Sequence, residues 1–113
     1  MTLRVALFSL SLLALPGFVQ AADKMLAVED GKFTPETLMM NKGDKLVVTN
    51  NTQKKPFIWG QRGNYSFDFR ATKEDNWTHE PGQSLGIVIN EPGKYFIGNT
   101  YDGTMQATVI VGQ

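Results

Sequence analysis

Beyond residue 21, apolar side chains alternate with polar ones and do not recur at helical spacing over three turns. Leu38 and Met40 lie two positions apart, and so do Leu46 and Val48. Successive side chains of a strand point to opposite faces, so this alternation gives each segment one apolar face. The pattern therefore predicts an all-β domain.

Turn residues divide the chain into short segments. Asp30-Gly31 and Asn50-Asn51-Thr52 are typical turn sequences. Aspartate, asparagine and threonine side chains can hydrogen-bond to the nearby backbone, and glycine has no side chain to restrict a tight bend. Strands are predicted at residues 24–29, 37–41, 45–49, 84–89, 94–98 and 106–111, with one irregular strand between residues 53 and 83. The strands on either side of Lys42-Gly43-Asp44 are predicted to form a hairpin. About seven short strands at fairly even spacing predict a Greek-key β-sandwich.

The first 21 residues have the pattern of a secretory signal. Arg4 precedes an apolar run from Val5 to Leu15, and small residues follow near Ala21. The run is too short for a membrane-spanning helix. We therefore expect residues 1–21 to be a signal peptide and residues 22–113 to be a single periplasmic or secreted domain, with no membrane insertion after cleavage.

Composition excludes several classes of protein. The chain has no cysteine and one histidine, with 11 basic and 11 acidic residues. A disulfide scaffold, a thiolate metal site and a strongly basic nucleic-acid-binding protein are therefore excluded. An exported domain of this size without a disulfide must be stabilised by its apolar core alone.

Three blocks of sequence resemble one known family. They are Phe33-Thr34-Pro35 with Gly43-Asp44 downstream, Glu80-Pro81-Gly82-Gln83-Ser84, and Glu91-Pro92-Gly93-Lys94-Tyr95. Their order and spacing resemble the cupredoxins, small blue-copper β-sandwiches, and most of all the plastocyanin, amicyanin and pseudoazurin group. The resemblance covers nearly all of residues 22–113 and implies a cupredoxin-like sandwich.

The resemblance also implies where a copper ion would lie in such a fold. The family holds copper with a histidine, a cysteine, a second histidine and usually a methionine, and the corresponding positions here are Phe57, Asn99, Asp102 and Met105. Only Met105 is retained, and type 1 chemistry requires the thiolate. We therefore expect no type 1 copper site and no resident cofactor. Asn99 and Asp102 are expected to shape their loop, and Phe57 to fill the vacated space.

A copper ion bound at a different site is the alternative. Thioether and imidazole groups bind copper, and the exported domain offers Met25, Met39, Met105 and His79. His79 lies just before a proline-glycine turn, where a histidine is typically a solvent-exposed surface residue. A copper-handling protein with a methionine and histidine site therefore remains a second interpretation.

A binding role is the leading hypothesis. No nucleophile motif surrounds Ser66 or Ser84, so we expect no enzymatic activity. Phe57, Trp59 and Arg62 combine apolar and cationic groups of the kind enriched in protein interfaces. We expect a non-enzymatic module that contacts a protein partner, not nucleic acid, through the end of the sandwich that carries the loops.

Overall fold

The computed structural model describes residues 21–69 and 78–113. The predicted signal peptide lies outside the described residues except for Ala21. The described chain forms nine strands and no helix, so no helix in it could cross a membrane. The strands are β2 (Asp23–Glu29), β3 (Lys32–Thr34), β4 (Thr37–Asn41), β5 (Lys45–Asn50), β6 (Ile58–Arg62), β7 (Tyr65–Asp68), β8 (Ser84–Val88), β9 (Gly93–Asn99) and β10 (Asp102–Gly112).

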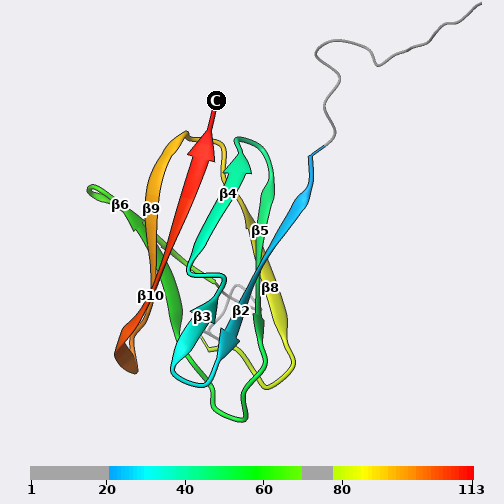
Figure 1. Cartoon of the computed structure of the whole chain (residues 1–113), viewed down its shortest axis with the longest axis vertical. Helices are drawn as coiled ribbons and strands as arrows, with labels where there is room; N and C mark the ends of the chain where they lie inside the picture. Colours follow the sequence, from blue (N-terminus) through cyan, green and yellow to red (C-terminus); the bar gives the residue numbers. More distant parts are fainter. Residues whose placement is uncertain (1–20, 70–77) are drawn as a thin grey trace, which may run out of the picture.

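Two mixed sheets face each other (Figure 1). One has the strand order β3-β2-β5-β8 and the other has the order β4-β10-β9-β6-β7. Strand β2 pairs in parallel with β5, and β10 pairs in parallel with β4, while the other neighbours are antiparallel. The predicted all-β sandwich is confirmed.

The alternating pattern places the core between the two sheets. In β5, Leu46 and Val48 are fully buried, whereas the alternate residues Lys45, Val47 and Thr49 are exposed or half-buried on the other face. Fully burying a side chain of this size contributes about 1.5–3 kcal/mol. The other strands supply the rest of the core in the same way, chiefly Leu26, Val28, Phe33, Met40, Ile58, Tyr95, Ile97, Ala107, Val109 and Val111.

The predicted hairpin between residues 37–41 and 45–49 is wrong. Strands β4 and β5 belong to different sheets, and the turn between them carries the chain from one sheet to the other. The buried carboxylate of Asp44 holds this turn, because it accepts hydrogen bonds from the backbone N–H groups of Asn41 at 2.9 Å and Ala22 at 3.0 Å. Turn residues mark the ends of the strands but do not determine which sheet edge each strand joins.

Nine strands replace the predicted seven, for local reasons. Strand β3 is too short to show alternation, yet it pairs with β2 and buries Phe33. The irregular strand expected between residues 53 and 83 is a hairpin of β6 and β7, which turns at Gly63 with a φ of 59°. Strand β10 begins at Asp102, and a break in its register before Gln106 absorbs part of the expected loop.

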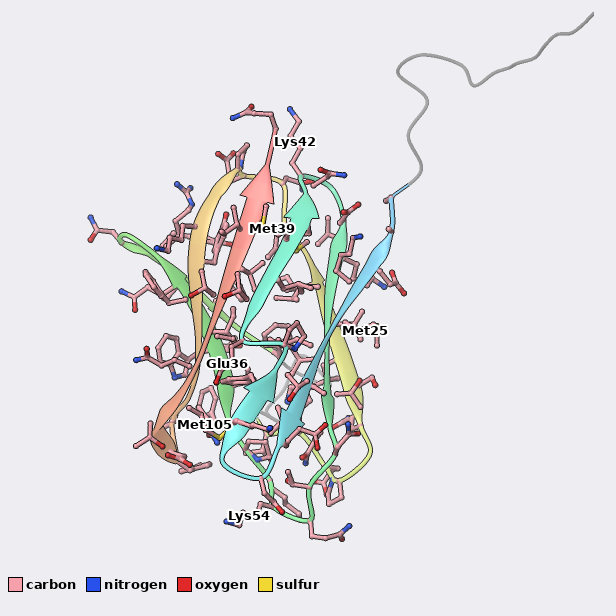
Figure 2. The ribbon with its side chains drawn as sticks, in the orientation of Figure 1. Met25, Glu36, Met39, Lys42, Lys54 and Met105 are labelled. Carbon is pink, nitrogen blue, oxygen red and sulfur yellow. The ribbon has the colours of Figure 1, made fainter. Side chains whose placement is uncertain are left out.

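The sandwich has two ends. Strand β9 runs from Gly93 at one end to Asn99 at the other (Figure 1). Lys54 lies at the same end as Asn99, and Lys42 lies at the far end (Figure 2). We call the end with Asn99 and Lys54 the loop end, and the end with Gly93 and Lys42 the opposite end.

Candidate functional site

A pocket of about 140 Å³ opens at the loop end. Asn99, Asp102 and Met105, three of the four positions that the sequence resemblance matches to copper ligands, line it together. The other lining residues are Val28, Glu29, Asp30, Gly31, Thr52, Lys54, Lys55, Pro56 and Tyr101. The structure therefore brings together three positions that the sequence places at intervals of three residues.

Hydrogen bonds within the loop already engage these side chains. The Asn99 amide donates from Nδ2 to Met105 Sδ at 3.5 Å and accepts from the backbone N–H of Tyr101 at 3.0 Å. Asp102 Oδ1 accepts from the Thr104 hydroxyl at 2.6 Å and from its backbone N–H at 3.1 Å. Asn99 and Asp102 thus each accept a hydrogen bond from the backbone N–H two residues further on, and these bonds shape the turn between β9 and β10.

The pocket carries charges of both signs. The Thr104 side chain, followed by the Thr104 backbone N–H, lowers the pKa of Asp102, and the nearby charge of Lys54 acts in the same direction. Asp102 is therefore ionised at neutral pH. Lys54 and Lys55 line the same space as Asp102 and Glu29. Hard carboxylate oxygens beside a soft thioether suit different classes of metal ion, so this set does not form a matched ligand group.

Phe57 lies beside this pocket but does not line it. Its carbonyl accepts a hydrogen bond from the backbone N–H of Thr100 at 2.9 Å, which ties the loop before β6 to the turn after β9. The half-buried side chain lines a separate hollow of about 290 Å³, together with Trp59. The position that the resemblance matches to the fourth ligand is thus adjacent in space, but its side chain lines a neighbouring hollow.

His79 is fully buried, so the expectation of a solvent-exposed histidine is wrong. Its Nε2 lies 3.1 Å from the carbonyl of Val48, and its backbone N–H donates to Pro56 at 2.9 Å. Because a carbonyl only accepts, Nε2 carries the proton, and Nδ1 has no partner among residues 21–69 and 78–113. Burial lowers the pKa of His79, although the bond to Val48 opposes this shift. The imidazole is therefore neutral at pH 7.

Asn50 organises the loop that leads to the site, a role that sequence analysis missed. Its buried amide donates to the carbonyls of Lys54 at 2.7 Å and His79 at 3.2 Å. Its Oδ1 accepts from the Thr52 hydroxyl at 2.6 Å and from the Thr52 backbone N–H at 2.9 Å. The sequence Asn50-Asn51-Thr52 predicts a turn. Only the structure shows that Asn50 is buried and that its hydrogen bond to the Lys54 carbonyl fixes the position of Lys54.

The three methionines proposed for an alternative copper site lie apart in this structure. Met25 on β2 and Met39 on β4 are 53% and 65% exposed and belong to different sheets, whereas Met105 is buried at the loop end. Figure 2 shows the three methionines well separated. Across the described part of the chain, no group of three or more His, Cys, Asp or Glu side chains could hold a metal ion.

The three residues suggested for partner binding do not share one surface. Trp59 lies against Gly98, where a Cβ atom would be 2.3 Å from the indole ring. Arg62 lies three residues further along β6, on the other face of the strand, with its guanidinium carbon 5.5 Å from the centre of the Tyr95 ring. Phe57 and Trp59 therefore form one feature near the loop end, and Arg62 belongs to another.

Tyr101 is an exposed residue at the loop end that sequence analysis did not single out. It is 69% exposed, the highest value among the large exposed hydrophobic residues of the described chain, and it lines the loop-end pocket. The sequence feature that could have identified Tyr101 is its position in a turn between Asn99 and Asp102, whose side chains shape that turn. Aromatic side chains held at turns are frequent contact residues in protein interfaces.

Comparisons with solved structures identify the fold. An amicyanin from Paracoccus versutus (Thiobacillus versutus) is 20% identical, with 86% of this chain and 84% of that chain covered at a TM-score of 0.64. The reduced Cu(I) form of an amicyanin mutant is 15% identical, with coverages of 83% and 86% and a TM-score of 0.66. No family model and no curated protein matches the sequence. The chain therefore has the cupredoxin fold, in a divergent sequence without cysteine.

Proposed function

We propose that this protein is an exported, non-enzymatic binding module that works without a type 1 copper site and contacts a protein partner through its loop end. One observation carries the proposal: the amide of Asn99, the residue that the resemblance matches to the thiolate ligand, donates a hydrogen bond to the Met105 sulfur. An amide cannot replace the thiolate that gives type 1 copper its bonding and redox properties. The cupredoxin scaffold is thus retained around a polar turn.

The exposed groups at the loop end suit a protein partner. Tyr101 offers a large exposed aromatic surface, and Lys54 and Lys55 lie beside the same pocket. A pocket of about 140 Å³ is small for a drug-sized ligand but can receive part of a partner side chain. Aromatic residues at the centre of an interface with charged groups around them are a common arrangement.

Metal content tests the first half of the proposal. The protein is purified from copper-replete cells after fractionation of the periplasm, and bound metal is measured by mass spectrometry. We expect the chain in the periplasmic fraction with substoichiometric copper. One copper per chain that disappears on replacing Met25, Met39, His79 or Met105 with alanine would instead establish the copper-handling alternative.

Site-specific crosslinking tests the second half. A photoreactive phenylalanine analogue is placed at Tyr101, at the loop end, and separately at Phe96, an exposed aromatic of β9 that does not line the pocket. We expect the Tyr101 variant to form one defined crosslinked complex in cells and the Phe96 variant to form none of it. Equal crosslinking from both positions, or none from Tyr101, would refute a role for the loop end.

Restoring the ligands tests the correspondence on which the proposal depends. The variant that combines Phe57→His, Asn99→Cys and Asp102→His, with Met105 retained, is expected to bind Cu(II) and to show the intense visible absorption of copper bound to thiolate. The same variant with Asn99→Ser in place of cysteine is the control and should remain colourless. A folded, colourless cysteine variant would show that the positions are assigned wrongly.

A further inference from the structure

A second pocket, of about 260 Å³, lies at the opposite end of the sandwich. Arg62 of β6, Tyr65 of β7 and Tyr95 of β9 line it, together with Val88 at the end of β8 and residues 89–91 that follow. We call it the Arg62 pocket. None of these residues lines the loop-end pocket, so the two sites are separate.

The side chain of Arg62 is held in place by its surroundings. Its guanidinium carbon lies 5.5 Å from the centre of the Tyr95 ring, a cation–π arrangement. Its stem crosses Gly93, where a Cβ atom would lie only 2.6 Å from Arg62 Cδ. The Tyr95 ring is fixed in turn, because its hydroxyl donates to the carbonyl of Glu91 at 2.8 Å. The guanidinium is therefore preorganised, which reduces the entropy lost when it binds a ligand.

The charge of Arg62 has no counterion within the part of the chain that the structure describes. Arg62 forms no salt bridge there, and its Nε is buried without a hydrogen-bond partner. The Glu91 side chain lines the same pocket but does not pair with it. A buried donor without a partner is costly, and a carboxylate can accept two parallel hydrogen bonds from one guanidinium.

We infer that the Arg62 pocket binds a small monocarboxylate with an apolar body. The carboxylate would pair with Arg62, and the apolar body would lie against Tyr65, Val88 and Ile89. The volume is below that of sites for drug-sized ligands, which limits the body to a few carbon atoms or one ring. Glu91 carries the same charge as such a ligand and lines the same pocket, so it would repel the carboxylate.

Titration with benzoate tests the inference on the full chain. The Nε–H resonance of Arg62, assigned by its loss in Arg62→Lys, reports binding directly by NMR. We expect benzoate to shift this resonance in a saturable manner. Benzyl alcohol, which has the ring without the charge, and inorganic phosphate, which has charge without the ring, should each bind at least about tenfold more weakly, because each lacks one of the two contacts. Equal binding of benzoate and either probe, or no saturation, would overturn the inference.

Charge variants separate the pocket from general electrostatics. Arg62→Gln should weaken benzoate binding at least about tenfold, through loss of a charge-assisted pair. Lys42→Gln removes the same charge at the same end but outside the pocket, and should leave the affinity unchanged. Glu91→Gln changes an exposed side chain and should tighten binding, which provides a test even if Arg62→Gln does not fold. Equal weakening in Arg62→Gln and Lys42→Gln, or an unchanged affinity in Glu91→Gln, would contradict the proposed site.

Discussion

The stability of the protein should fall between pH 7 and pH 5 because of one residue, His79. The folded state buries a neutral imidazole whose Nδ1 has no hydrogen-bond partner in the described chain, so a proton added there gains no compensating hydrogen bond from that part of the chain. In the unfolded chain the same ring takes up a proton with a pKa near its ordinary value of 6.5. Burial holds the pKa of the folded state below that value. Unfolding therefore takes up a proton as the pH falls below 6.5, and the free energy of unfolding decreases.

The limiting size of the effect follows from proton linkage. If the folded state takes up no proton, the free energy of unfolding falls by up to about 1.4 kcal/mol for each pH unit well below 6.5. Between pH 7 and pH 5 the limit is about 2 kcal/mol. For a domain of this size, that loss lowers the melting temperature by about 8 to 15 °C.

Urea unfolding at pH 7, 6 and 5 measures this loss for the wild-type chain and for His79→Gln. The pH window isolates the histidine because it is the only one in the chain. The pKa of Asp44, lowered by the backbone N–H groups of Ala22 and Asn41, and the pKa of Asp102, lowered by Thr104, lie below 3.8. Their stabilising contributions are lost only as the pH falls below that value.

His79→Gln removes the titrating group but keeps a side chain that can donate to the Val48 carbonyl. We expect its free energy of unfolding to be nearly independent of pH between 7 and 5, whatever its absolute value. An equal pH dependence in wild type and variant would show that His79 is not responsible. A wild-type chain equally stable at both pH values would show that the folded state binds the proton as readily as the unfolded state does.

Two further substitutions test packing and the loop network, each by urea unfolding against a matched control. Gly98→Ala should cost about 1–3 kcal/mol because the new Cβ would lie 2.3 Å from the Trp59 ring, whereas Gly103→Ala, with no atom within 4 Å of its Cβ, should change stability by less than about 0.5 kcal/mol. Asn50→Ala should cost about 2–4 kcal/mol because it breaks a buried network, and Asn51→Ala, which loses one exposed bond, at most about 1 kcal/mol. Similar losses within either pair would refute the corresponding explanation.

The strands could largely be predicted from sequence, because alternation is a local property. Leu46 and Val48 identify the buried face of β5 without reference to any other strand. The pairing of strands could not be predicted in the same way. The segments before and after Gly43 have the pattern of a hairpin, but β4 pairs with β10, with Met39 opposite Ile110, 71 residues further along the chain. Pairing depends on which edges the rest of the sheet leaves open.

The candidate site was predictable only to the extent that the resemblance placed it. Asn99, Asp102 and Met105, which the resemblance singles out, do line one pocket. The hydrogen bonds that these side chains form could not be predicted, since the bond from Asn99 to Met105 depends on side-chain rotamers. The hydrogen bonds of Asn50 likewise depend on residues far from it in sequence, and Asn50 and Asn51 have the same side chain in the same turn.

The sequence by itself determined the strand-forming alternation, the turn positions and the lack of a thiolate, because each depends only on residue type and near neighbours. The tertiary structure decided that His79 is buried, that Arg62 faces away from Trp59, and that the opposite end carries a second pocket. Burial and charge pairing are set by what the other sheet and the connecting loops place around a side chain. Those surroundings come from distant parts of the chain, so no local pattern records them.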